Sequence, residues 1–180
     1  MKIKILVALL FLGLFSVKAQ QAVIVGGYAM YPSKNIMQNT ALSKEHKTLT
    51  QLIKLAVLNE TLTKKGPFTI FAPTDAAFNK LPKGKLDDLQ KLENVLSLEE
   101  FLLYHIVPRK LDQKTIIAEI KANNGQAKFK TVQGKFITAE LNGKKIVLRD
   151  EFNTASEITI ANAYQSNGVL FVIDTPLQVK

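Results

Sequence analysis

The chain has 180 residues, enough for one domain with a substantial core but short for two. An apolar fraction of 47% with 22% charged residues is typical of a globular domain. The absence of cysteine excludes disulfides, a thiolate metal site and a lipid anchor on an N-terminal cysteine. The formal net charge is +9 at pH 7.

Residues 1–19 have the features of a secretory signal peptide. Lys2 and Lys4 precede an apolar run from Ile5 to Phe15, which is shorter than the roughly 20 apolar residues of a membrane span. We therefore predict cleavage near Ala19-Gln20, secretion or export to the periplasm, and a mature chain that is not transmembrane. Cleavage removes three lysines and no acidic residue, so the formal charge falls from +9 to +6.

The basic charge of the mature chain indicates the chemistry of its partners. A basic exported protein is expected to meet acidic polysaccharide, lipid headgroups or acidic proteins, and not nucleic acid. The lysines are scattered along the chain, however, and this distribution is also consistent with simple solubility.

Residues 20–32 are predicted to form an N-terminal arm, and residues 33–180 a single domain. Ser33 is the expected cap of a first helix. A capping box at residues 48–51 predicts an amphipathic helix after it, and Gly66 is expected to end a shorter helical segment, residues 60–65, in the left-handed conformation.

The segment from Gly66 to Pro82 is predicted to form a strand followed at once by a short helix. Its strand is apolar at most positions, which indicates burial on both faces. Pro73 lacks an N–H and ends the ladder, Thr74 is the expected N-cap, and Asp75 faces the positive end of the helix dipole.

Residues 86–125 predict further helices. A second capping box at residues 97–100 opens a helix that carries His105 on its apolar face together with Leu98 and Phe101. Pro108 ends this helix, and Asp112 is expected to cap the next one.

After residue 125 the pattern changes from helical spacing to alternation. Strands are predicted at residues 127–132, 135–141, 144–148, 157–161 and 169–174, with a tight turn at Asn142-Gly143. Helices first and strands second indicate an α+β fold with an antiparallel sheet, which the early strand at Phe68 joins from far away in sequence.

Three blocks of the sequence resemble the fasciclin domain family, in that family's order. They are TIFAPTDAAF from Thr69, LLYHIVPRKL from Leu102 and SNGVLFVID from Ser166. The upstream stretch VGGYAMYPSKNI is similar to the lead-in of small secreted single-domain bacterial members.

The resemblance implies a fold and a role. The fold is an antiparallel β-wedge with helices packed around it, and the role is adhesion at cell surfaces or in matrices rather than catalysis. The Tyr-His region of the family is an adhesion site, so the candidate binding residues are Tyr104, Arg109 and Lys110. The motif residues expected to be structural are Thr74, Asp75, His105, Asn167 and Gly168.

The chain also departs from the family pattern. Integrin-binding animal members carry an Asp-Ile pair before the closing block, and the matching positions here are Asn162 and Ala163, which argues against an integrin-type site. Arg109 replaces the family's usual glycine, and Phe171 replaces a frequent histidine.

No cofactor or metal is expected. His46 and His105 are too few for a histidine-rich metal site, and no nucleotide or phosphate fingerprint occurs. Calcium held by carboxylates stays open, but the adjacent acidic pairs lack the alternating spacing of a calcium loop. His105 is the one catalytic candidate. Its apolar helical face favours a buried, hydrogen-bonded role, with Asp75 or the backbone beside it as partner. Tyr104 points about 100° away on the helix, which places its hydroxyl near the surface.

The sequence thus predicts an exported, monomeric, non-enzymatic binding module for cell adhesion or surface association. Its expected partner is a cell-surface or matrix protein or an acidic polysaccharide. The alternatives are a hydrolase that uses His105 and a carrier of a small apolar ligand between wedge and helices. The cations expected to help binding are Arg109, Lys110, Lys114, Lys128, Lys130, Lys144 and Lys145.

Overall fold

The computed structural model of the chain describes residues 21–180, so the predicted signal peptide and its cleavage site lie outside the described residues. Helices are α1 (Ile36–Thr40), α2 (Lys47–Leu55), α3 (Asn59–Thr63), α4 (Asp75–Phe78), α5 (Lys85–Leu89), α6 (Val95–Tyr104) and α7 (Gln113–Ala122), with a 3-10 turn, η1 (Leu92–Asn94). Strands are β1 (Val23–Val25), β2 (Tyr28–Met30), β3 (Phe68–Pro73), β4 (Ile106–Val107), β5 (Gln126–Lys130), β6 (Phe136–Asn142), β7 (Lys145–Arg149), β8 (Ala155–Gln165) and β9 (Gly168–Ile173). No helix within residues 21–180 combines the length and apolar character needed to cross a membrane.

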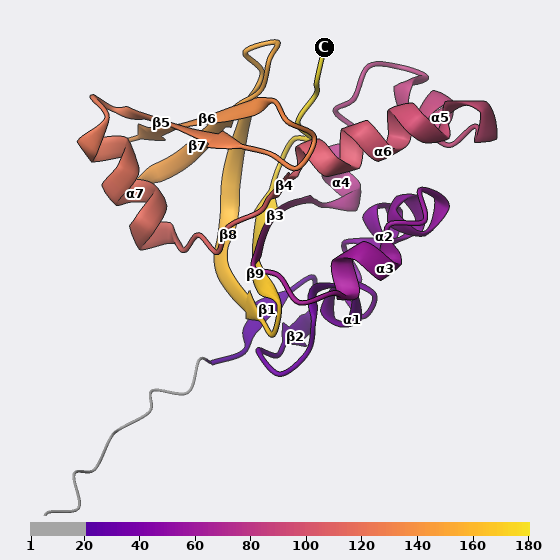
Figure 1. Ribbon diagram of the computed structural model, residues 1–180, viewed down its shortest axis with the longest axis horizontal. Helices are drawn as coiled ribbons and strands as arrows, with labels where there is room; N and C mark the ends of the chain where they lie inside the picture. The colour runs from indigo at the N-terminus through magenta and orange to yellow at the C-terminus, as the bar shows by residue number, and fades with distance from the viewer. Residues whose placement is uncertain (1–20) are drawn as a thin grey trace, which may run out of the picture.

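Seven strands form one sheet in the order β4-β3-β9-β8-β7-β6-β5 (Figure 1). The predicted α+β class is confirmed. One ladder differs from the prediction, because β3 and β9 pair in parallel, from Phe68 opposite Gly168 to Pro73 opposite Ile173. The sheet is therefore mixed, and its two parallel strands, β3 and β9, begin at the same end of the sheet.

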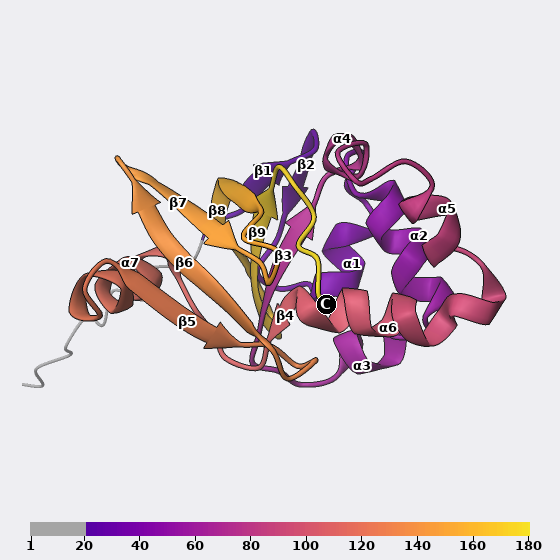
Figure 2. The same cartoon turned by 90° about the horizontal axis from the view of Figure 1, so that it is seen from above.

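Helices cover the sheet in two groups. Helices α1, α4 and α6 contact β9, β3 and β4, whereas α7 packs on β5 and β6 at the far end of the molecule (Figures 1 and 2). The first apolar cluster contains Leu52 and Leu102, and the second contains Phe71 and Phe129. Burial of these side chains is the main favourable contribution to folding.

Two helix starts lie where the sequence predicts them. Thr74 Oγ1 accepts a hydrogen bond from the backbone N–H of Ala77 at 3.1 Å at the start of α4. Asp112 Oδ1 accepts one from Thr115 N at 2.7 Å at the start of α7. Both side chains satisfy N–H groups that the first helical turn leaves without an internal partner.

The predicted capping boxes of α2 and α6 are wrong, because both helices begin earlier. Helix α2 starts at Lys47 and α6 at Val95, so the two boxes lie inside the helices. The N–H of Thr48 is instead bonded by a distant side chain, since Asp75 Oδ1 accepts from it at 2.8 Å. A tertiary contact thus replaces the local cap and ties α2 to α4.

The N-terminal residues pack on the sheet. Strands β1 and β2 form a hairpin that buries Val25 and Met30 completely. Helix α1 is capped by Asn35, which forms a reciprocal capping box with Gln38, and not by the predicted Ser33. This segment therefore contributes to the core instead of trailing in solvent.

Candidate functional site

His105 is buried at the end of α6, with 2% of its surface exposed, as its place on the apolar face predicts. The predicted partner, Asp75 or the backbone beside Asp75, is wrong. Nδ1 of His105 lies 2.8 Å from the carbonyl oxygen of Phe101, and Nε2 accepts the backbone N–H of Leu177 at 2.9 Å. His105 thus links α6 to the C-terminal segment rather than to the Thr74-Asp75 block.

These partners determine the protonation of His105. A carbonyl oxygen only accepts and a backbone N–H only donates, so Nδ1 carries the proton and Nε2 carries the lone pair. Burial lowers the pKa of His105 to about 4, so the ring is neutral at physiological pH. Both ring nitrogens are occupied by backbone groups, and neither is free to transfer a proton to a substrate in this conformation.

Tyr104 differs from its prediction. Its side chain is completely buried, and its hydroxyl donates to the carbonyl oxygen of Phe136 at 2.9 Å. Burial raises the pKa of the Tyr104 phenol, which therefore stays protonated. The prediction that this hydroxyl lies near the surface is wrong, because β6 covers it, and Tyr104 does not present itself to a partner.

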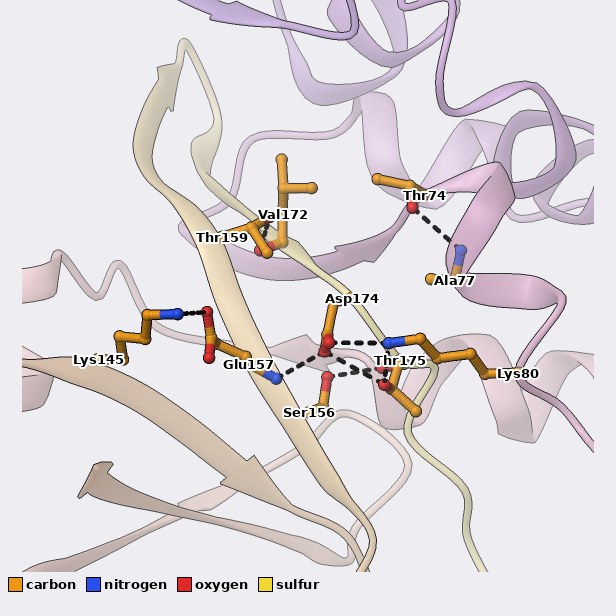
Figure 3. Close-up of polar contacts among 10 residues, drawn as sticks. All are labelled: Thr74, Ala77, Lys80, Lys145, Ser156, Glu157, Thr159, Val172, Asp174 and Thr175. Atoms are coloured by element: carbon orange, nitrogen blue, oxygen red, sulfur yellow. Dashed lines mark hydrogen bonds and ion pairs between the residues drawn. The ribbon is translucent and has the colours of Figure 1, made fainter. Parts of the chain in front are cut away.

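Two cations beside β8 and β9 are already paired with carboxylates. Lys80 Nζ lies 2.8 Å from Asp174 Oδ2, and Lys145 Nζ lies 2.6 Å from Glu157 Oε1 (Figure 3). The second oxygen of Asp174 accepts the backbone N–H of Glu157 at 2.8 Å, which joins β8 to the end of β9. The charge of Lys145, one of the predicted binding cations, is therefore largely neutralised.

Unpaired cations gather instead around a cavity of about 570 Å³ at the turn between β8 and β9. We call it the lysine cavity. Its lining residues are Asn35, Thr63, Lys64, Lys65, Gly66, Pro67, Lys110, Gln165, Ser166, Asn167 and Gly168. Of the seven cations singled out by the sequence, Lys110 alone belongs to this lining.

Asn167 builds the buried floor of the lysine cavity. Its amide nitrogen donates to the carbonyl oxygens of Leu62 at 2.6 Å and Lys64 at 3.1 Å. Its amide oxygen accepts the backbone N–H of Ile36 at 3.0 Å. One side chain thus holds the start of α1 and the C-terminal end of α3 against the β8–β9 turn.

Gly66 and Gly168 allow the segment before β3 and the β8–β9 turn to approach each other closely beneath Asn167. A Cβ on Gly66 would lie 2.0 Å from the carbonyl oxygen of Asn167, and one on Gly168 would lie 2.2 Å from that of Phe68. Gly66 does not take the left-handed conformation predicted for it. Gly66 is instead required because its backbone lies against the carbonyl of Asn167, and the parallel pairing of β3 with β9 brings these two residues together.

The electrostatic character of the lysine cavity is uniformly positive. Within the described residues, no aspartate or glutamate lines it, and none of Lys64, Lys65 and Lys110 belongs to an ion pair. Lys110 Nζ lies 5.4 Å from the centre of the Tyr164 ring, which favours a cation over its face. Arg109, by contrast, points to Glu119, with 2.6 Å between Nη2 and Oε1.

Sequence reasoning missed Lys64, Lys65 and Asn35 as members of this site. Lys64 and Lys65 lie shortly before β3. Because β3 and β9 run in parallel, the residues before β3 lie beside the turn before β9. The sequence pattern indicated an antiparallel sheet, and in an antiparallel pair the segment before β3 and the turn before β9 would lie at opposite ends of the strands.

We expect Asn167→Ala to lower the free energy of unfolding by about 2 kcal/mol. The change removes three hydrogen bonds and leaves the buried N–H of Ile36 without its partner. Urea unfolding measures this loss. Ser166→Ala is the matched control, because the Ser166 side chain is exposed and its backbone N–H alone is bonded, to Lys34. Equal midpoints for the two variants would contradict the role of Asn167.

The apolar space between the sheet and the helices is small. It is lined by residues including Leu49, Ile70 and His105 and holds about 10 Å³. Pockets for small ligands typically measure about 300 to 1,000 Å³. A small apolar ligand would therefore need the core to open.

This architecture is that of a fasciclin module. A solved FAS1 domain pair from the insect cell adhesion molecule fasciclin I superposes with a TM-score of 0.72 at 17% sequence identity, covering 82% of this chain and 52% of the insect chain. At this low identity the likeness concerns the fold.

The sequence comparisons establish the family. The fasciclin domain family model matches residues 44–179, and the chain belongs to the fasciclin domain family. Protein sll1483 of Synechocystis sp. is 32% identical over 86% of this chain and 79% of its own length. Human periostin is 30% identical over 66% of this chain, which spans 13% of periostin.

Proposed function

We propose that the protein is an exported, non-enzymatic binding module that attaches to anionic surfaces or matrix material through the lysine cavity. The observation that carries this proposal is the unpaired positive charge of Lys64, Lys65 and Lys110 around one surface cavity. Clustered exposed cations attract anionic partners over about 8 Å at physiological salt.

The comparisons support an adhesive role. The insect relative is described as a cell adhesion molecule, and its fold is shared with this chain. Arg109 stands next to Lys110, but it does not line the lysine cavity and its guanidinium is paired with Glu119, so the proposal rests on Lys110 and not on Arg109. Tyr104 takes no part, because it is buried.

The departure at Asn162 supports a site other than the integrin type. Asn162 adopts a left-handed conformation with φ 60°, and its Oδ1 accepts the backbone N–H of Gln113 at 2.8 Å. This asparagine fixes the start of α7, so the chain uses the position for structure.

We expect binding to isolated cell envelope and to acidic polysaccharide to weaken as salt rises. Lys64→Glu combined with Lys110→Glu should lower affinity at low salt roughly tenfold or more, because each change replaces an attraction by a repulsion. Sedimentation with envelope fragments, or titration with the polysaccharide, measures the effect.

The matched control is Lys83→Glu combined with Lys85→Glu. It changes the net charge by the same amount on exposed residues at and just before the start of α5, which lies at the upper right of Figure 1, away from the β8–β9 turn at the bottom. Equal losses for the two double variants would reduce the effect to net charge. Unchanged binding of the lysine-cavity variant at both salt concentrations would overturn the proposed function.

A further inference from the structure

We infer that the lysine cavity recognises sugar units of an acidic polysaccharide, bearing carboxylate or sulfate groups, in preference to an acidic peptide of equal charge. This inference rests on the proposed function and names the class of its ligand. Four features of the cavity support it, namely its shape, its hydroxyl groups, its apolar wall and the separation of its cations.

The first feature is a solvent-open rim above a rigid floor. Lys64, Lys65, Lys110 and Ser166 are exposed, whereas Asn167 is buried and bonded on three sides. The volume of about 570 Å³ lies within the range of ligand pockets and is much larger than one anion requires. A polymer segment can therefore lie across the cavity while part of it descends to the floor.

The second feature is the set of hydroxyl groups beside the lysines. Thr63 Oγ1 donates to Glu60 O at 2.8 Å, so its own lone pairs remain available to accept. Ser166 is exposed, and the hydrogen bond that it makes within residues 21–180 comes from its backbone N–H to Lys34, so its hydroxyl can both donate and accept. Every hydroxyl of a sugar unit both donates and accepts, so it can use both functions of these side chains, whereas the side chains of an acidic peptide only accept and its donors are confined to the backbone.

The third feature is the wall formed by Gly66 and Pro67. The pyrrolidine ring of the exposed Pro67 is apolar, and Gly66 beside it has no side chain. Such a surface suits the C–H face of a pyranose ring, whose burial is favourable. Sites for small organic groups combine apolar walls with a few placed polar groups in this way.

The fourth feature is that the cations come from separate segments. Lys64 and Lys65 follow α3, and Lys110 follows β4, so they approach the cavity from different chain segments. A lysine ammonium is a compact charge that contacts a carboxylate or a sulfate equally well. The ligand class is therefore an anionic sugar, and the experiment below distinguishes sugars that carry carboxylates from sugars that carry sulfates.

Isothermal titration of the mature protein tests the inference with four probes of similar length. They are a galacturonate tetramer, a chondroitin sulfate tetrasaccharide, a neutral cellulose tetramer and an oligoglutamate that matches the galacturonate in charge. We expect one or both acidic sugars to bind roughly tenfold more tightly than oligoglutamate and the neutral sugar, and Lys64→Glu with Lys110→Glu to abolish this binding.

Ser166→Ala tests the contribution of the hydroxyl to affinity separately from the contribution of charge. It should weaken the acidic sugar severalfold and leave oligoglutamate binding unchanged, because one hydroxyl is lost and no charge is altered. Lys83→Glu with Lys85→Glu should leave the ranking of the four probes intact.

The outcomes separate this inference from the proposed function. Equal binding of oligoglutamate and acidic sugars, or no sugar binding while envelope binding still depends on Lys64 and Lys110, overturns the sugar assignment alone. Envelope binding that does not depend on these lysines overturns the proposed function as well.

Discussion

Replacing His105 with alanine is expected to lower the free energy of unfolding by about 4 kcal/mol. The imidazole is almost completely buried, and its removal leaves a cavity together with an unpaired N–H of Leu177 and carbonyl of Phe101. Truncation of large buried side chains typically costs about 2 to 5 kcal/mol, and an unsatisfied buried polar group about 1 to 3 kcal/mol. Urea unfolding followed by circular dichroism measures the loss.

His105→Leu separates the two contributions. Leucine fills most of the space but offers no partner to Leu177, so this variant should still lose about 2 kcal/mol. A His105→Ala protein with the same unfolding midpoint as wild type would contradict the structural role. If it also lost a hydrolase activity, the catalytic alternative would be preferred.

Acid is expected to destabilise the wild-type protein by about 3 kcal/mol between pH 6.5 and pH 4. His105 has a pKa of about 4 in the folded protein and of 6.5 when unfolded. Between these values the unfolded state binds more protons, so stability is fully present above pH 6.5 and is lost as the pH falls. His46 contributes in the same direction, because burial also lowers its pKa.

Chemical unfolding at successive pH values measures this dependence, and His105→Leu is the control that lacks the titrating group. Its stability should fall much less over the same range, with the remaining slope coming from His46 and from carboxylates. A His105→Leu protein with the full wild-type slope would show that the acid sensitivity arises elsewhere.

The sequence predicted much of the fold, because the local signals agree with the tertiary structure. The cap at Thr74 and the strand before it are set by residues within a few positions of one another. The capping box at residues 48–51 failed because Asp75 supplies the bond at Thr48 from 27 residues away, and a local pattern contains no information about such a contact.

The candidate site was predicted less completely for the same reason. Lys110, Asn167 and Gly168 lie in blocks that resemble the family, and they were singled out. Lys64 and Lys65 reach the site through the parallel ladder between β3 and β9, whose direction cannot be read from alternation in either strand. Tyr104 was misplaced because the helix angle gives its direction but not the strand that covers it.

The position of β9 has a consequence for how the chain reaches its folded state. This final strand lies between β3 and β8, so the centre of the sheet is made from segments about 100 residues apart in sequence. Folds dominated by such distant pairings form slowly, because the entropy cost of closing long loops comes before the stabilising contacts form. Until residue 173 is available, β3 lacks its parallel neighbour and the two apolar clusters cannot close around it. On the proposed exported route, this delay would keep the chain open enough to be threaded through a membrane before its last strand completes the sheet on the other side.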